Sequence, residues 1–194
     1  MKSENPKIKS NVIYAIAELT QNNPFGQKHF LDLNILVILI PLVKSNIEEI
    51  ASSALHCISS IVRQFEPGCA SFIEQNGLEC IVEGLESAHP KVFTKSCFLI
   101  SSLTSEHPEI GEEFVKLNGI EKLANCLDSV TGFDIKTESV LLALNTLIGS
   151  SEGKERCKNT QIYSQLISII ENNTEKPECE EMLQYSRNLI QCFK

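Results

Sequence analysis

A repeat of about 42 residues runs through the chain and limits what it can fold into. The clearest copy, Lys95–Asp128, reads as an apolar helix, a His-Pro break, a short helix, an Asn-Gly pair and another apolar helix. Shifting the sequence by one repeat superposes landmark residues of the same kind: Leu103, Ile61 and Leu19; Phe114, Phe72 and Phe30; Asn118, Asn76 and Asn34; Leu123, Ile81 and Leu39; Ser129, Ser87 and Ser45. Three helical segments per repeat predict an all-α array in which each repeat packs on its neighbours.

This period and helix pattern are typical of an armadillo-repeat, right-handed superhelical solenoid. We expect a single domain over residues 1–194 with repeats at about 5–45, 46–87, 88–129 and 130–172, and a closing helix at about 178–193. The chain starts directly on a long helix, so we interpret it as a solenoid without leading helices. Apolar side chains of that first helix should then be exposed, which favours self-contact or local mobility at this end.

The expected helices follow from apolar periodicity and from Pro, Gly and Asn breaks. The long helices are expected at 5–20, 47–65, from residue 90 and at 134–148, the short ones at 27–33, 69–75 and 152–159, and the buried ones at 35–44, 78–86 and 162–171. Pro41 should kink or shorten its helix, and Pro67-Gly68 should form a break. Six glycines are interpreted as turn residues: Gly26, Gly68, Gly77, Gly111, Gly119 and Gly153.

Charge and composition exclude several classes of protein. Lys and Arg number 17 against 25 Asp and Glu, a net charge of -8, which argues against nucleic-acid and anionic-membrane binding. The longest apolar run, Ile35–Val43, is too short to span a membrane, and Met1–Ser10 is too polar for a signal peptide. We therefore expect a cytoplasmic protein.

The sequence carries no catalytic or cofactor motif. The eight cysteines form no CxxC pair, and we expect eight free, buried thiols without disulfides. The four histidines lack metal-ligand spacing. We predict no enzyme activity, no metal, no cofactor and no direct nucleotide binding.

In such arrays the long helices line a concave face, so their exposed positions form a ladder. Taking Leu19, Ile61, Leu103 and Leu147 as buried landmarks, the ladder positions lie one and five residues earlier on each helix. The candidate partner-binding residues are Tyr14, Glu18, His56, Ser60, Phe98, Ser102, Leu142 and Thr146, extended by Arg63 and Lys95. For Phe98 and Leu142, burial against a neighbouring helix is as well supported as exposure. Arg63 is the strongest single candidate, because Arg and aromatic residues dominate interface hot spots.

Three strings carry a family resemblance: ISSIVRQFEPG (Ile58–Gly68), KSCFLISSL with SEHPE (Lys95–Leu103 and Ser105–Glu109), and MLQYSRNLIQCF (Met182–Phe193). They resemble the core domain of the Hsp-binding nucleotide exchange factors, the cytosolic armadillo-type exchange factors of the 70-kilodalton heat-shock chaperones. The resemblance covers nearly the whole chain but not the start, where the family has further helices.

The resemblance implies a co-chaperone whose concave face binds one lobe of the chaperone's ATPase domain, displaces the other lobe and promotes ADP release. Of the ladder residues, Arg63 and Phe98 lie within the matching strings. The alternative is an armadillo scaffold that binds an extended peptide or another protein without exchange activity. Basic-peptide clamping like that of the nuclear-import adaptor is disfavoured, because the chain has no Trp and no Asn at positions 18, 60, 102 or 146.

Overall fold

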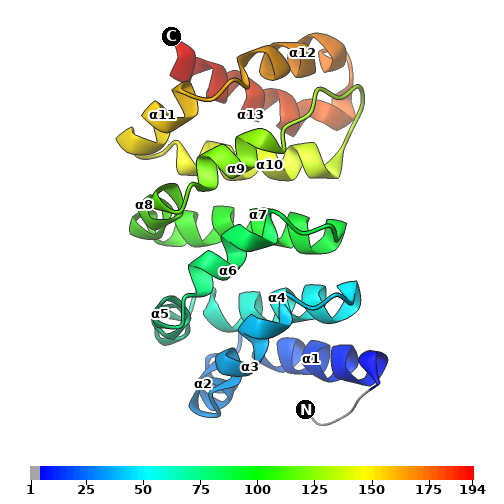
Figure 1. The fold of residues 1–194 in the computed structure, drawn as a ribbon, viewed down its shortest axis with the longest axis vertical. Coiled ribbons are helices and arrows are strands. Elements are labelled where there is room, and N and C mark those ends of the chain that lie inside the picture. The colour runs from blue at the N-terminus through cyan, green and yellow to red at the C-terminus, as the bar shows by residue number, and fades with distance from the viewer. Residues whose placement is uncertain (1–4) are drawn as a thin grey trace. The chain divides into compact units, whose positions relative to one another are not determined.

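The computed structural model describes residues 5–194, and these residues form helices joined by short turns (Figure 1). The contacts divide the chain into two compact units, Met1–Ser96 and Cys97–Lys194, with the boundary inside helix α7 (Pro90–Glu106). We call them the N-terminal and C-terminal units. The prediction of a single domain stays a prediction.

Helices in the two units follow the predicted order of long, short and buried helix. The N-terminal unit contains α1 (Pro6–Thr20), α2 (Pro24–Asp32), α3 (Ile35–Leu42), α4 (Glu48–Val62), α5 (Glu66–Glu74), α6 (Gly77–Gly84) and the start of α7. The C-terminal unit contains the rest of α7, then α8 (Pro108–Lys116), α9 (Gly119–Asn125), α10 (Ile135–Leu147), α11 (Ser151–Lys158), α12 (Tyr163–Asn173), the 3-10 turn η1 (Pro177–Cys179), α13 (Glu180–Ile190) and the 3-10 turn η2 (Gln191–Phe193).

Helix starts are encoded by side-chain caps and by proline. The Asn5 side chain accepts a hydrogen bond from the Lys7 amide at 3.0 Å, and Pro6 occupies the first turn of α1, where its missing N–H is not needed. Pro67 lies in the first turn of α5 in the same way, so the predicted break at Pro67-Gly68 is wrong. The chain breaks earlier, between Val62 and Glu66.

A left-handed asparagine joins the short and buried helices in three successive repeats. Asn34, Asn76 and Asn118 have φ of 54°, 56° and 63° and directly precede α3, α6 and α9. Asparagine tolerates this conformation better than most residues with a Cβ. The Asn-Gly signal in the sequence therefore reports a left-handed Asn at the helix junction.

Glycines of the short helices allow close packing against the preceding long helix. Gly26, Gly68, Gly111 and Gly153 lie inside α2, α5, α8 and α11, so their interpretation as turn residues is wrong. A Cβ at Gly68 would lie 2.5 Å from the Ile61 carbonyl oxygen. At Gly26 and Gly153 it would collide with the equivalent carbonyls of Leu19 and Leu147. These positions recur because the repeat packs backbone against backbone there.

The core of the N-terminal unit lies where α1 packs on α4. Ile13 and Ala17 of α1 are fully buried, as are Ala54 and Ile61 of α4. A hydrogen bond of 2.8 Å between the Thr20 and Ser60 hydroxyls joins the ends of the two helices. At this end of α1 and α4 the polar groups are thus hydrogen-bonded, while apolar side chains fill the space between the helices.

In the C-terminal unit, the predicted closing helix α13 packs on α10 and α12. Leu144, Leu166 and Met182 are fully buried among these helices. Asn145 donates from its side chain to the Tyr185 carbonyl at 2.9 Å, which ties α10 to α13. The outward side of α13 carries the exposed polar residues Glu181, Gln184, Arg187 and Asn188.

One predicted landmark is not buried. Leu19 is 59% exposed, whereas its equivalents Ile61, Leu103 and Leu147 are buried. The residues of α1 that face α4 are Ile13, Ala17 and Thr20, and Leu19 projects from another side of the helix. The prediction that Leu19 is a buried landmark is therefore wrong, because the repeat equivalence with Ile61 does not supply Leu19 with the same neighbours.

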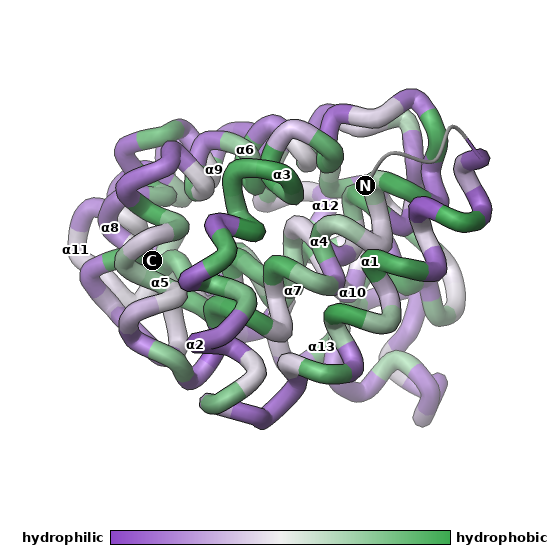
Figure 2. The backbone as a smooth tube through the Cα atoms, turned by 90° about the horizontal axis from the view of Figure 1, so that it is seen from below, coloured by the Kyte–Doolittle hydropathy of each residue, from purple (hydrophilic) through white to green (hydrophobic). Residues whose placement is uncertain are grey.

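Leu19 belongs to a continuous exposed apolar stripe on α1, together with Ile8, Val12 and Ala15. Large exposed apolar residues continue onto α2 and α3: Phe25, Leu33, Val37 and Ile38. Figure 2 shows the strongly hydrophobic colouring of α3. We call these eight residues the apolar end face. Their exposure agrees with the prediction for the start of the chain.

Helix α3 is therefore less buried than the sequence predicts, and it ends at Leu42, one residue after Pro41. Helix α6 contains no proline and has the same length of 8 residues, so the repeat rather than Pro41 sets this length. No single helix of the described residues is long and apolar enough to cross a membrane. One pair, α2 with α3, passes on length and composition but is bent by 87°.

Candidate functional site

The candidate site is the set of ladder side chains on the long helices, which we call the long-helix face. Its N-terminal part consists of Tyr14, Glu18, His56, Ser60 and Lys95, and its C-terminal part of Phe98, Ser102, Leu142 and Thr146. Arg63 is treated separately, because it lies outside α4.

In the N-terminal part, the predicted rungs of neighbouring helices come together. The Tyr14 ring stacks on the His56 ring with centroids 5.3 Å apart and planes at 28°. The Glu18 carboxylate lies 3.7 Å from His56 Nε2. Tyr14 is 52% exposed and His56 is half-buried. The predicted spacing therefore places an aromatic and ionisable cluster on the surface of α1 and α4.

Burial and positive charge shape the electrostatics of this cluster. The pKa of His56 is lowered, chiefly by burial and then by the Lys95 ammonium, while the Glu18 carboxylate opposes the shift. Burial also lowers the pKa of Lys95, and Lys91 one turn earlier lowers it further. His56 is therefore neutral at pH 7, and it lies beside a partly desolvated cation.

Two other predicted residues have structural partners. The Ser60 hydroxyl bonds to Thr20 and donates to the Cys57 carbonyl at 2.9 Å, so it serves helix packing. Arg63 is the C-cap of α4 and has an extended backbone, so helical spacing does not place its side chain on the long-helix face. Its carbonyl and that of Ser60 accept hydrogen bonds from the Gln27 side chain at 3.2 and 2.9 Å. The sequence argument missed this role of Gln27.

In the C-terminal part, Phe98 is the exposed rung. Its side chain is 45% exposed, which decides between the two alternatives left open for this residue. Leu142 is half-buried. The hydroxyls of Thr146 and Ser101 bond at 2.8 Å, and Ser102 donates to Glu106 at 3.3 Å. Phe98 is thus the exposed apolar side chain of this part of the long-helix face.

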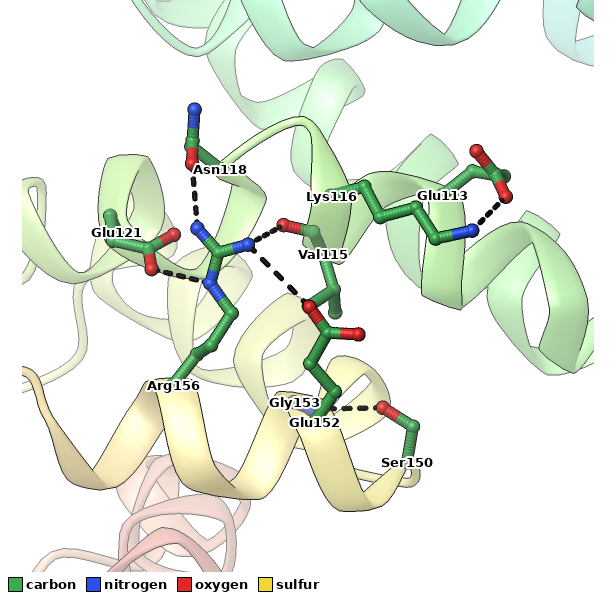
Figure 3. Close-up of polar contacts among 9 residues, drawn as sticks. All are labelled: Glu113, Val115, Lys116, Asn118, Glu121, Ser150, Glu152, Gly153 and Arg156. Atoms are coloured by element: carbon green, nitrogen blue, oxygen red, sulfur yellow. Dashed lines mark hydrogen bonds and ion pairs between the residues drawn. The ribbon is translucent and has the colours of Figure 1, made fainter.

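One charged side chain of the C-terminal unit that bonds to three residues of other helices and turns, Arg156, was not predicted. From α11 it donates to the Glu121 carboxylate at 2.7 Å, to the Asn118 side chain at 2.6 Å and to the Val115 carbonyl at 2.7 Å (Figure 3). Glu152 lies 3.9 Å away. A planar guanidinium suits such a fork of acceptors. Arg156 therefore holds α11 against the α8–α9 junction. The only sign of this contact in the sequence is that Glu121 and Asn118 precede Arg156 by roughly one repeat.

The cysteine thiols are mostly buried, and burial lowers their reactivity. The structure holds all eight cysteines as thiols, six of them buried. Burial raises the pKa of Cys57 and of Cys157 to about 12 and that of Cys80 to about 11. Such thiols are poor nucleophiles, because the thiolate is the reactive form. Among residues 5–194, no group of three or more His, Cys, Asp or Glu side chains is placed to hold a metal ion.

Comparison with known proteins identifies the fold. No protein-family profile matches the sequence, and no curated protein matches it. The solved structure of ARO, an armadillo repeats only protein from Plasmodium falciparum, is similar, with a TM-score of 0.76 and 19% identity over 95% of this chain and 80% of that one. The designed armadillo repeat protein YIII(Dq.V1)4CPAF, solved in complex with the peptide (KR)4, has a TM-score of 0.79 and 17% identity over 99% of this chain and 78% of that one.

Computationally designed armadillo repeat proteins for modular peptide recognition are equally similar, with a TM-score of 0.79 and 16% identity over 100% of this chain and 79% of theirs. At these identities the likeness concerns the fold alone. The chain has the all-α armadillo-repeat fold, as its 42-residue period predicts.

Proposed function

We propose that this chain is a nucleotide exchange factor that binds the ATPase domain of a 70-kilodalton heat-shock chaperone through its long-helix face. The proposal rests on the sequence resemblance of Ile58–Gly68, Lys95–Glu109 and Met182–Phe193 to that family of exchange factors. The exposed Phe98, which lies in one of these strings, is the structural observation that supports it best. Aromatic side chains, Phe included, are enriched at protein–protein interfaces relative to the rest of the surface.

Exchange by this route requires no chemistry from the chain itself. A protein that binds the open form of the ATPase domain better than the closed form shifts the equilibrium toward the open form, from which ADP leaves. The coupling is reciprocal, so ADP must weaken the binding of this chain by the same factor. A hundredfold effect corresponds to about 2.7 kcal/mol of differential contact, which a few hot spots can supply.

Release of a fluorescent ADP analogue from the ATPase domain tests the proposal directly. The wild-type chain should accelerate release, and saturating ADP should weaken its binding to the ATPase domain. Phe98→Ser should slow the stimulated release at least tenfold. Phe133→Ser is the matched control, because Phe133 is 50% exposed but lies in the loop between α9 and α10. Exchange activity would be excluded if the chain does not accelerate release of the ADP analogue and if saturating ADP does not change its binding to the ATPase domain.

A second candidate is an armadillo scaffold for an extended peptide. The observation that favours it is the fold of the designed protein solved with the peptide (KR)4. In this chain, however, the N-terminal part of the long-helix face carries Lys95 and His56. Binding of an alternating Lys-Arg peptide with no effect on ADP release would favour this candidate over exchange.

A further inference from the structure

Lys95 stands out among the lysines whose surroundings the structure describes. Lys28, Lys44, Lys116 and Lys136 are each paired with a carboxylate at 2.7–3.2 Å. Lys95 is half-buried and forms no ion pair with any residue in 5–194. An unpaired cation that has lost part of its hydration is energetically unfavourable. A carboxylate brought by a partner would compensate this charge.

The immediate neighbours of Lys95 leave its positive charge uncompensated. Lys91 lies one turn earlier on α7, and His56 lies across from it on α4. Two carboxylates border this group without pairing with Lys95. Glu48 accepts a hydrogen bond from the Lys91 backbone amide at 3.1 Å, and Glu18 contacts His56 on the side of α1. The Lys95 ammonium therefore stays without a carboxylate partner among residues 5–194.

The chain as a whole carries a net charge of -8, so the cluster formed by the two cations Lys91 and Lys95 on α7 is a local exception. A polyanion such as RNA would be repelled by the surrounding acidic surface. One or two carboxylates on a folded partner would instead meet the cluster locally and be steered to it. The charge distribution therefore favours a protein partner with an acidic patch.

We infer that Lys95 and His56 form a carboxylate-binding site, which receives an Asp or Glu side chain of the protein partner between α4 and α7. Lys95 supplies the charge, and the His56 ring, held by its stack on Tyr14, borders the site. The inference rests on the proposed binding of a protein through the long-helix face and names the chemistry of the contact. The proposed carboxylate site contains neither Phe98 nor any other residue of the C-terminal unit.

Four variants separate this site from general electrostatics. Lys95→Met keeps the aliphatic stem and removes the charge, and it should weaken binding of the ATPase domain about tenfold. Lys95→Arg should bind within about twofold of wild type. Lys28→Met is the matched control, since Lys28 is exposed and paired with Asp32, and it should also bind within about twofold. His56→Gln should weaken binding less than Lys95→Met. Unchanged thermal melting of each variant establishes that the fold is intact.

A second measurement is independent of the chaperone. The His56 ring proton resonances are followed by NMR during titration with acetyl-tetraglutamate amide at millimolar concentration, with a tetraglutamine peptide as the neutral control. The acidic peptide should shift His56 but not His29 in wild type, and Lys95→Met should abolish the shift. A His56 shift that depends on Lys95, without accelerated ADP release, would support this site while refuting exchange.

Conversely, accelerated ADP release with Lys95→Met indistinguishable from Lys28→Met would overturn the carboxylate site and leave exchange standing. A response to inorganic phosphate that is stronger than the response to acetyl-tetraglutamate would also overturn it, because the site would then prefer a phosphorylated partner.

Discussion

Leu19 and Ile61 occupy the same position in successive repeats, yet Leu19 is 59% exposed and Ile61 is fully buried. The two residues differ in their neighbours and not in their place on the helix. Ile61→Ala should therefore lower the free energy of unfolding by about 2–5 kcal/mol, through lost apolar burial and a cavity. Leu19→Ala should change it by less than about 0.5 kcal/mol. Urea unfolding of both variants measures the difference. Equal losses at the two positions would mean that α1 is covered in solution.

We predict that the apolar end face is covered by a second copy of the chain in solution. Contiguous exposed apolar surface promotes association. Sedimentation velocity should show concentration-dependent self-association of the wild-type chain. The double substitution Val12→Ser with Leu19→Ser should reduce it, and Tyr14→Ser, an exposed change on another side of α1, should not. A chain that stays monomeric at all concentrations would contradict this expectation.

The sequence predicts the repeat well because the same local signals recur in each copy. Prolines at 6, 90 and 108 and the Asn-Gly junctions at 76 and 118 mark real helix starts, and Ile61 and Leu103 are buried as predicted. It fails where the neighbours of a residue decide the outcome, as for Leu19. Arg63 shows the same limit, since the helix ends one residue before it. Arg156 and Gln27 could not be found, because their partners lie about one repeat away and depend on helix packing.

The short-helix glycines give a test in which two principles predict opposite signs. Helix propensity alone predicts that Gly68→Ala stabilises α5 by up to about 1 kcal/mol. The new Cβ would lie 2.5 Å from the Ile61 carbonyl oxygen, so we expect a loss of about 1–3 kcal/mol instead. Ala70→Gly, at an exposed position of the same helix, should cost about 1 kcal/mol through propensity alone. Stabilisation by Gly68→Ala would show that the two helices can separate at no cost.

Arg156 should be the most important charged side chain for the stability of the C-terminal unit. Its hydrogen bonds to Glu121, Asn118 and the Val115 carbonyl predict a loss of about 2–3 kcal/mol for Arg156→Ala, at the scale of hydrogen bonds to charged groups. Arg156→Lys should recover little, because an ammonium cannot reach the same fork of acceptors. Arg187→Ala, at an exposed position of α13, is the control and should cost less than about 0.5 kcal/mol. If Arg156→Lys matches the stability of wild type, the fork geometry is not what holds α11.

His56 predicts a defined pH dependence of stability. Its pKa is lowered in the folded chain, chiefly by burial and then by Lys95, so the unfolded chain takes up a proton at a higher pH than the folded chain does. The contribution of His56 is therefore fully present above its ordinary pKa of about 6.5 and is lost as the pH falls through the lowered folded value. His56→Gln should remove this part of the decline between pH 7.5 and pH 5.

Two neighbours of His56 should change that decline in opposite directions. Lys95→Met removes a cause of the lowered pKa and should make the decline smaller. Glu18→Gln removes the carboxylate that opposes the shift and should make it larger. Tyr14 still stacks on the His56 ring in both variants, and Glu48 contacts Lys91 instead of His56. Burial, the largest cause of the lowered His56 pKa, is therefore kept in both variants. Urea unfolding across this pH range, with the His56 titration followed by NMR, measures both changes. Shifts of the same sign in the two variants would show that charge at Lys95 and Glu18 does not act on His56 as the structure indicates.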